Sequence, residues 1–430
     1  MSSSKVTRHL IRMHAVAVAI LVCSTGSAWA ADGISLKASA RVLGVSSSLG
    51  EEGPLASAGH LDGKASPLAT ERVLSEAGLR AVGNGLVVDA EVREDRLRAG
   101  GVWRSEAAFK AREAYFAKDT GEGRITVGRK VLSWDVGYAF RPNDFVQAAE
   151  RRGLVDATLT GVDSVQWESF GEDWSASVVG FRSKVGEQRV ALDRYDESAL
   201  AVRLYRSTAW GDLFGFAKLG EYSKASVGAS FTAVYGESVA FHGSARYFQR
   251  AQAVSISADG GRIVETDPVV VGQRGATGQA LIGVSWTGSV QTSVIAEAWF
   301  DGLAPSRSFW RTWNERNALL VRAGETAPVP ALAGAAAGNL RWQASALRLQ
   351  SLQRANLFVR LAQGFEQQEI STDLLVWPED GSGVVTFRAT GSIAGVKLEL
   401  GARRFVGQQG SIGKQLGTAS SVFLNLSAKI

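Results

Sequence analysis

Apolar and polar residues alternate along most of this chain. In residues 86–93, for example, Leu86, Val88, Ala90 and Val92 fall on one side of an extended strand and Asp89 on the other. Side chains of a strand alternate between its two faces, so each such segment predicts a strand with one apolar and one more polar face. Long helical blocks do not interrupt the series, which favours an antiparallel meander.

About 18 segments show this pattern, which is too many for one ordinary sandwich, whereas transmembrane barrels have 8 to 26 strands or more. They lie at residues 36–42, 86–93, 103–112, 124–131, 163–170, 174–182, 200–204, 213–219, 227–235, 239–248, 280–286, 290–300, 340–352, 357–365, 374–377, 385–389, 396–403 and 421–430. We therefore expect an all-β fold, a transmembrane antiparallel meander β-barrel of about 16–18 strands.

Longer polar or Gly-rich stretches separate some of the strands. The main ones are predicted to be loops, at about residues 44–85, 133–161, 250–278 and 301–339. In outer-membrane barrels the long loops share one end and the short turns the other. The predicted strands do not obey this rule throughout, because the tight turn at Gln353 and Arg354 falls on the long-loop side.

The last ten residues carry a clear alternation. Val422, Leu424 and Leu426 share one face, while Asn425 and Lys429 lie on the other. This segment resembles the closing strand of Gram-negative outer-membrane barrels, in which the apolar face meets lipid and the polar face a wet lumen. It departs from that pattern in its final residue, which is Ile430 rather than an aromatic residue.

The N-terminus has the features of an export signal. Basic residues precede an apolar run of about eight residues at 15–22, too short for a membrane-spanning helix of about 20. Ala28, Trp29 and Ala30 then match an A-x-A cleavage site. We expect residues 1–30 to be a signal peptide cleaved after Ala30, and residues 31–430 to form the outer-membrane barrel. A lipoprotein signal at Cys23 is the alternative, but Val22 stands where a small residue is usual.

Composition narrows the possible functions. The single cysteine, Cys23, lies in the signal, so the exported chain has no disulfide or thiolate metal site. The whole chain has 47 Lys and Arg against 42 Asp and Glu, and the signal contains bases but no acid. The exported chain is therefore close to neutral, and we expect no nucleic-acid partner. No metal-ligand cluster or cofactor motif is present, so no cofactor is expected.

The polar strand faces carry more bases than acids. Seventeen bases are predicted on these faces against five acids, which are Asp89, Glu91, Glu106, Glu297 and Glu399. Rings of Arg and Lys inside a pore favour anions, so an anion-biased lumen is predicted, although each base could also pair with a neighbouring carboxylate. The principal candidates are Arg104, Lys110, Arg112, Arg203, Arg246, Arg360, Lys397 and Arg403.

One segment carries a family resemblance. Residues 127–135 read VGRKVLSWD and residues 138–145 read YAFRPNDF. They resemble the signature G-R-Q-x-x-x-W-G … N-P-x-D of outer-membrane channel proteins related to the alginate-export porins, with Lys130 in place of Gln and Asp135 in place of Gly. The resemblance covers about 20 residues and implies a pore constriction. By resemblance, the pore-lining candidates are Arg129, Lys130, Trp134, Asp135, Tyr138, Arg141 and Asp144; an ordinary loop packed by its own aromatic residues is the alternative.

Enzymatic functions fit poorly. His242 has Ser244 nearby, but no phospholipase or protease motif surrounds it. The sequence favours a channel for passive or facilitated passage of an anionic solute, such as an acidic sugar or polysaccharide. The alternative is a non-transporting surface or structural barrel plugged by its loops. Expected partners are outer-membrane lipid, the barrel-assembly machinery and the anionic small molecule or polysaccharide; the oligomeric state stays open.

Overall fold

A computed structural model describes residues 30–31, 33–63, 68–144, 146, 154, 159–185, 195–256, 262–349 and 351–429. The predicted signal therefore lies almost wholly outside the described residues. Its last residue, Ala30, belongs with Ala31 to a short strand, β1 (Ala30–Ala31), that pairs with the next strand.

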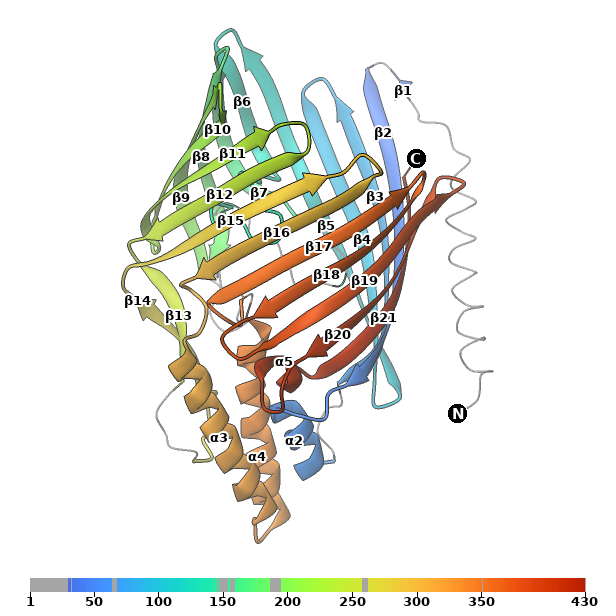
Figure 1. Cartoon of the computed structure of the whole chain (residues 1–430), viewed down its shortest axis with the longest axis vertical. Coiled ribbons are helices and arrows are strands. Elements are labelled where there is room, and N and C mark those ends of the chain that lie inside the picture. The colour runs from blue at the N-terminus through green and yellow to red at the C-terminus, as the bar shows by residue number, and fades with distance from the viewer. Residues whose placement is uncertain are drawn as a thin grey trace.

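Eighteen long strands form one closed antiparallel barrel, which confirms the predicted fold (Figure 1). Each strand pairs with the strands before and after it in the barrel, and the last pairs with the first, β21 with β2. Closure leaves no free sheet edge, so every strand can satisfy its backbone hydrogen bonds in lipid. The strands are β2 (Ile34–Leu49), β3 (Ala69–Gly83), β4 (Leu86–Ala99), β5 (Val102–Thr120), β6 (Gly123–Lys130), β7 (Val162–Phe170), β8 (Trp174–Val185), β9 (Tyr195–Thr208), β10 (Gly211–Gly220), β11 (Lys224–Tyr235), β12 (Val239–Phe248), β15 (Thr277–Thr287), β16 (Thr292–Asp301), β17 (Ala355–Phe365), β18 (Gln368–Trp377), β19 (Ser382–Ile393), β20 (Val396–Val406) and β21 (Thr418–Lys429).

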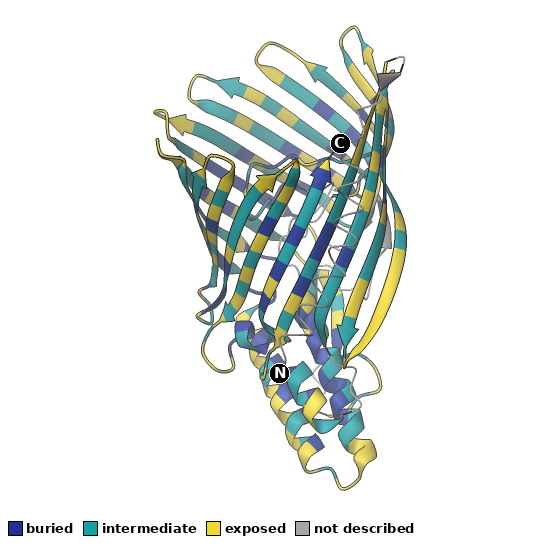
Figure 2. Ribbon diagram, turned by 90° about the vertical axis from the view of Figure 1, so that its right-hand side faces the viewer, coloured by how far each residue is buried: buried dark blue, intermediate teal, exposed yellow. Residues whose placement is uncertain are grey.

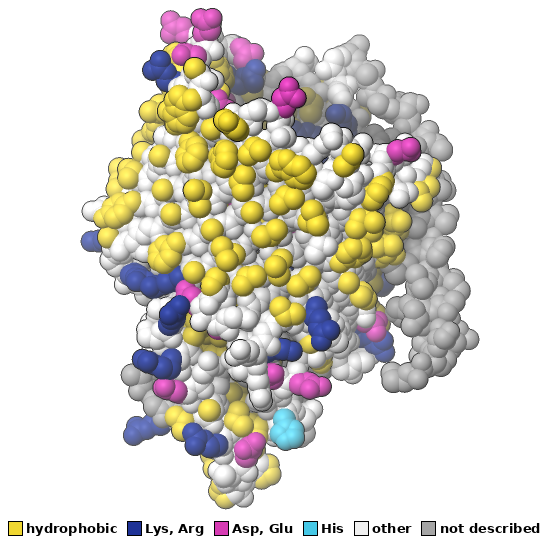
Figure 3. Space-filling model, viewed as in Figure 1, with side chains coloured by type: hydrophobic (Ala, Val, Ile, Leu, Met, Phe, Trp, Pro, Cys, Tyr) yellow, Lys and Arg dark blue, Asp and Glu magenta, His cyan; other side chains and the backbone are white. Residues whose placement is uncertain are grey.

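The alternation in sequence sets which side chains face outward. In β21, Val422 is 59% exposed on the outer surface, whereas Phe423 and Asn425 are buried inside the barrel. Buried and exposed residues alternate along many strands (Figure 2). Hydrophobic side chains cover the middle of the outer wall, while charged side chains gather above and below it (Figure 3). This is the surface that a lipid bilayer requires.

The two ends of the barrel differ. One end, here called the helical end, carries α2 (Pro54–Leu61), α3 (Arg307–Glu325), α4 (Pro330–Gln343), the 3-10 helix η1 (Ala344–Arg348), α5 (Ile412–Gln415) and the hairpin β13 (Ala251–Ile256) and β14 (Val269–Arg274) (Figure 1). The other end, here called the turn end, has only short connections. At the turn between β3 and β4, Asn84 and Gly85 have φ of 51° and 79°. None of the described helices is long and apolar enough to cross a membrane.

Two of the strand predictions were wrong, and their errors cancel in the total. The predicted loop at 44–85 contains the end of β2 and all of β3. The sequence does not predict β3, because the alternation of apolar and polar residues in it is weak. Its outward face includes the small residues Ser75 and Ala77, while the apolar Leu74 points inward. The predicted strand at 340–352 is instead the end of α4 followed by η1.

This second correction removes the conflict in loop sidedness. Gln353 and Arg354 are not a tight turn between two strands but the last residues of a connection that starts after β16 and contains α3 and α4. The predicted loop at 301–339 is therefore largely helical and extends to residue 354. The loop at 250–278 contains the β13–β14 hairpin. In the stretch 133–161, the described residues form no helix or strand.

Candidate pore constriction

After β6 the chain turns into the barrel interior. Leu132, Trp134 and Val146 are buried there against inward side chains of β8, β9 and β10, including Phe181 and Phe216. Burial of these apolar groups removes them from water and fixes one side of the segment to the wall. Residues 131–144 and 146, here called the inner loop, therefore narrow the lumen from the side of β8–β10.

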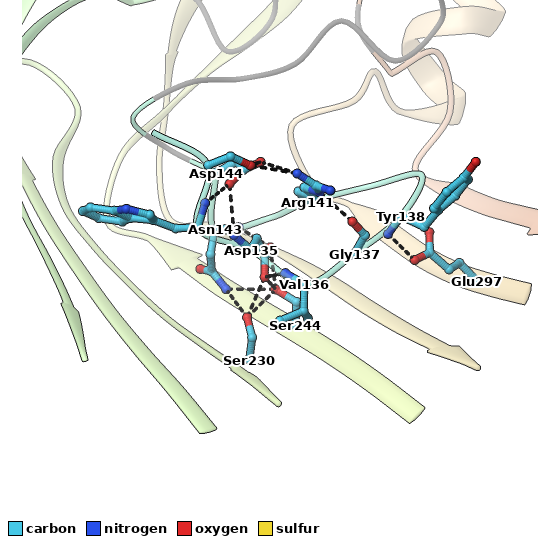
Figure 4. A network of polar contacts seen from close by, with 12 residues as sticks. Asp135, Val136, Gly137, Tyr138, Arg141, Asn143, Asp144, Ser230, Ser244 and Glu297 are labelled. Atoms are coloured by element: carbon cyan, nitrogen blue, oxygen red, sulfur yellow. Dashed lines mark hydrogen bonds and ion pairs between the residues drawn. The ribbon is translucent and has the colours of Figure 1, made fainter. Parts of the chain in front are cut away.

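A buried polar cluster fixes the next part of the inner loop to β11 and β12 (Figure 4). The Asp135 carboxylate accepts hydrogen bonds from Ser230 Oγ at 2.6 Å, from Ser244 Oγ at 2.8 Å and from the Asn143 backbone N–H at 2.7 Å. Asn143 Nδ2 donates to the same two hydroxyls at 3.0 and 2.9 Å. Its amide lies so close to Gly228 that a Cβ there would be 1.9 Å from Oδ1. The cluster is therefore specific for a glycine and two serines on the wall.

A second carboxylate holds the tip of the inner loop from β16. Glu297, which is almost completely buried, accepts hydrogen bonds from the backbone N–H groups of Tyr138 at 2.6 Å and Ala139 at 2.7 Å. It also lies 2.7 Å from His242 Nε2. Phe140 stacks on Trp299 with ring centroids 5.4 Å apart. The hydrogen bonds to Glu297 fix the backbone at Tyr138 and Ala139, and the Phe140 ring adds a side-chain contact. Glu297 therefore holds Tyr138 by its backbone rather than by its ring.

The inner loop is also tied to itself. The Asp144 carboxylate accepts from the backbone N–H groups of Trp134 and Asp135, at 2.6 and 3.0 Å, and from Ser133 Oγ. Arg141 donates to the Gly137 carbonyl at 2.6 Å and forms an ion pair with Asp144 at 3.5 Å. These contacts within the inner loop fix its shape in addition to its contacts with the barrel wall.

The same connection reaches the opposite wall at Leu154. This side chain packs on the apolar cluster of Leu43, Leu74 and Phe423, and its carbonyl accepts a hydrogen bond from Arg388 at 3.3 Å. These partners belong to β2, β3, β21 and β19. Asn143 therefore contacts β11 and β12 inside the barrel, while Leu154, from the same connection, contacts the part of the wall formed by β2, β3, β19 and β21.

The structure places six of the seven pore-lining candidates inside the barrel. Trp134, Asp135, Tyr138, Arg141 and Asp144 belong to the inner loop as described. Lys130 points inward from β6, where its ammonium lies 3.2 Å from Gln166 Oε1 and 3.7 Å from Glu168.

Arg129 is a correction. It lies on the outer face of β6, where its guanidinium donates to both carboxylate oxygens of Asp163 at 2.8 Å. The reason is geometric: Arg129 and Lys130 are neighbours on one strand, so they must point to opposite faces. The structure thus removes Arg129 from the pore.

Substitution at these two neighbours should separate the faces. Arg129→Gln should leave single-channel conductance and ion selectivity within error of wild type, because its charge lies outside the lumen. Lys130→Gln should shift selectivity toward cations. Planar-bilayer recordings of both variants provide the measurement, and equal effects of the two would contradict the assignment of faces.

Many inward bases prove to be paired with carboxylates. Arg112 forms ion pairs with Asp89 at 2.9 Å and Glu91 at 3.1 Å. Arg246 binds the inner loop, because its guanidinium donates a hydrogen bond to the Pro142 carbonyl at 3.1 Å. Arg403 donates to Thr386 Oγ1 at 2.9 Å, and the Arg203 guanidinium lies 5.2 Å from the Phe214 ring centroid. Arg112 therefore contributes little free positive charge to the lumen. The neutral partners of Arg246, Arg403 and Arg203 do not by themselves cancel the charge of these bases.

A continuous polar belt runs around the inner wall from β17 to β3. Arg360 pairs with Asp373 at 3.2 Å, Asp373 also binds Arg388, and Arg388 Nε lies 3.4 Å from Glu399. Asn425 then links Glu399 to Arg41, which pairs with Glu76 at 3.4 Å. The belt consists of Arg360, Asp373, Arg388, Glu399, Asn425, Arg41 and Glu76. Its charges alternate, so it is locally close to neutral.

Some inward bases differ from the belt. Throughout the described part of the chain, no side-chain ion pair or hydrogen bond is found for Lys37, Arg104, Lys110 or Lys397. Lys37, Arg104 and Lys397 are exposed, and Lys110 is half-buried. Lys37 and Lys397 lie near the turn end, whereas Arg104 lies near the helical end. We refer to these four as the free lumen bases.

Glu106 is exposed on the inward face of β5 that also carries Arg104 and Lys110, and its carboxylate forms no ion pair or hydrogen bond with the described residues.

No group of His, Cys, Asp and Glu able to hold a metal ion occurs among the described residues.

The architecture is that of outer-membrane porins. No family model matches the sequence, and no curated protein matches it. Among solved structures, Acinetobacter baumannii OccAB3 aligns over 93% of this chain and 100% of its own, with 9% identity and a TM-score of 0.53. Pseudomonas aeruginosa OccK8 (OprE) aligns over 94% of this chain and 99% of its own, with 9% identity and a TM-score of 0.51. Wzi, an Escherichia coli outer-membrane protein involved in capsule assembly, aligns over 90% and 83%, with 11% identity and a TM-score of 0.48. At these identities the likeness shows the fold.

Proposed function

We propose that this protein is a channel of the Gram-negative outer membrane that admits small anionic solutes passively, including acidic sugars. In this proposal the signal is removed after Ala30, and the barrel-assembly machinery inserts the barrel into lipid. The helical end then faces outward and the turn end the periplasm, as in barrels with long outer loops.

The free lumen bases are the observation that carries the anion preference. The belt neutralises itself, so the field in the lumen depends on charges without a counter-charge. Those on the described inward strand faces are mostly basic, with Glu106, Asp212 and Glu297 as counterexamples. A low-dielectric wall focuses such a field and raises the local anion concentration. The acidic sugar is a proposal drawn from this charge together with the family resemblance of residues 127–145.

Neutralisation of the free lumen bases tests this function. Lys37, Arg104, Lys110 and Lys397 changed together to Gln should lower the chloride-to-potassium permeability ratio, and most strongly at low salt. Screening acts over a Debye length of about 10 Å at 0.1 M salt and about 3 Å at 1 M. The measurement is the reversal potential of single channels in a salt gradient.

The matched control neutralises a base already paired. Arg388→Gln changes the same formal charge per residue but leaves Asp373 and Glu399 unbalanced, so it should reduce anion preference by adding local negative charge. Removal of one free base takes away the same unit of charge, so its effect on the permeability ratio should be of similar size. A quadruple variant with unchanged selectivity would contradict the proposal.

The alternative function is a surface barrel that does not transport. It is favoured by one observation: Asn143 contacts β11 and β12, while Leu154, from the same connection, contacts β2, β3, β19 and β21. If this connection seals the lumen, the wild-type barrel should show no ion current, whereas a variant lacking residues 131–161 should conduct. Current in the deletion variant alone would identify a plug.

A further inference from the structure

The Tyr138 ring is an aromatic surface placed at the narrowed part of the lumen. Its backbone N–H is fixed by Glu297 (Figure 4). One face of the ring packs against Phe358, with ring centroids 5.7 Å apart and an interplanar angle of 28°. The side chain nevertheless stays 42% exposed. The backbone of Tyr138 is fixed by a hydrogen bond and its ring packs on Phe358. Stacking of a ligand on such a ring therefore costs little conformational entropy.

One charged hydrogen-bonding group lies over this ring, and two carboxylates are bound to that group. The Arg360 guanidinium is 5.9 Å from the Tyr138 centroid. It donates to Glu369 at 2.7 Å and to Asp373 at 3.2 Å. The two carboxylates differ in access, because the Glu369 side chain is 42% exposed and that of Asp373 only 13%. Arg360 is thereby held in place, and the Glu369 carboxylate stays partly accessible to solvent.

This combination suits a particular ligand chemistry. The electron-rich face of an aromatic ring attracts the weakly positive C–H groups on one side of a sugar ring. Adjacent sugar hydroxyls can both donate and accept, so they match a carboxylate and a guanidinium placed side by side. A simple anion fits less well, because the positive charge of Arg360 is already balanced by Glu369 and Asp373. A purely apolar solute would leave these polar groups without partners.

We infer that Tyr138, Arg360 and Glu369 form a binding subsite for the pyranose ring of a carbohydrate. The inference rests on the proposed channel function. Within that function, the free lumen bases favour solutes of negative charge, and this subsite recognises the sugar ring. Recognition at the subsite is independent of solute charge, so neutral sugars bind there as well as acidic ones.

Binding to the purified full-length barrel tests this inference without requiring conduction. The probes are maltohexaose, which is neutral, and trigalacturonate, which is acidic; binding is measured by calorimetry in a detergent without a sugar head group. Wild-type protein should bind both. Tyr138→Ala should weaken maltohexaose binding roughly two- to tenfold, the loss expected for one aromatic stacking contact. Tyr138→Phe should keep the affinity, and Glu369→Gln should weaken binding of both sugars.

A control distinguishes the subsite from a general loss of aromatic surface. Tyr222 is 45% exposed in the connection between β10 and β11, at the helical end, and Tyr222→Ala should leave sugar binding unchanged. No binding of maltohexaose to the wild type, or equal binding by wild type and Tyr138→Ala, would overturn the inference. Sugar binding that depends on Tyr138 in a barrel that carries no current would uphold the inference and refute the channel.

Discussion

Release of the inner loop from the wall should raise single-channel conductance and make the current noisier. The variant is Asp135→Ala combined with Asn143→Ala, which removes the cluster that joins the loop to Ser230 and Ser244. Hydrogen bonds to a charged group contribute about 1.5–3 kcal/mol each. Since 1.36 kcal/mol is a factor of ten in an equilibrium, loss of even one should shift the loop toward detached states by roughly tenfold or more.

Two measurements report this change. Single-channel recording gives the conductance, and hydrogen exchange of residues 131–144 gives the loss of protection. The control is Asp163→Asn, which removes a similar carboxylate from the outer face of β7 and should alter neither. Faster exchange without a rise in conductance would mean that the inner loop does not limit the pore.

A charge on the outer wall should prevent stable insertion. Ile282 lies at the middle of β15 on the lipid-facing side and is 64% exposed. Arginine at the bilayer midplane of a barrel costs about 2–4 kcal/mol. Ile282→Arg should therefore reduce the yield of heat-modifiable, folded barrel in lipid vesicles by a large factor.

The matched control places the same residue on the other face of the same strand. Gln279 points inward and donates to Asp301 at 2.9 Å, so Gln279→Arg can pair with that carboxylate in the lumen. It should insert as well as wild type. Equal tolerance of both arginines would show that the outer surface is not in contact with lipid.

The barrel could be predicted from sequence because alternation is a local property. In segments such as residues 421–430, apolar and polar residues alternate along nearly the whole strand. Strand β3 does not show this alternation, because its outward residues are small and its inward face mixes Leu74 with charges. The helices α3 and α4 were read as loop and strand, although the end of α4 supplies Leu340 to an apolar cluster with Leu320 and Ala58. Those contacts join residues far apart in the sequence, so no local sequence pattern predicts them.

The charge pattern could be predicted only in part. The inward position of Arg112 followed from alternation, but its neighbour Glu113 also contacts an inward partner, Arg80, at 2.5 Å. A bulge opposite Asp89 and Ala90 permits this, because one extra residue resets the alternation of β5. The belt likewise depends on strand register, which places Asp373 beside Arg360 and Thr386. Register cannot be read from one strand alone, so the pairing of these bases was missed.

The inner loop shows the opposite case. Its residues were singled out by resemblance to channel proteins, and the structure independently places Trp134 to Asp144 inside the barrel. Its anchors Ser230, Ser244 and Glu297 were not assigned to it, because small hydroxyl residues and a single inward carboxylate are common on barrel strands. Gly228 offers the one local signal, since a glycine within a strand often marks a close approach of another segment.

The most direct test of the channel is the reversal potential of the purified wild-type protein in a planar bilayer, with a tenfold KCl gradient at low mean salt. The account predicts stepwise single-channel currents that reverse on the side of the chloride equilibrium potential, and a shift toward zero as the salt concentration rises. Currents that reverse on the potassium side would contradict it.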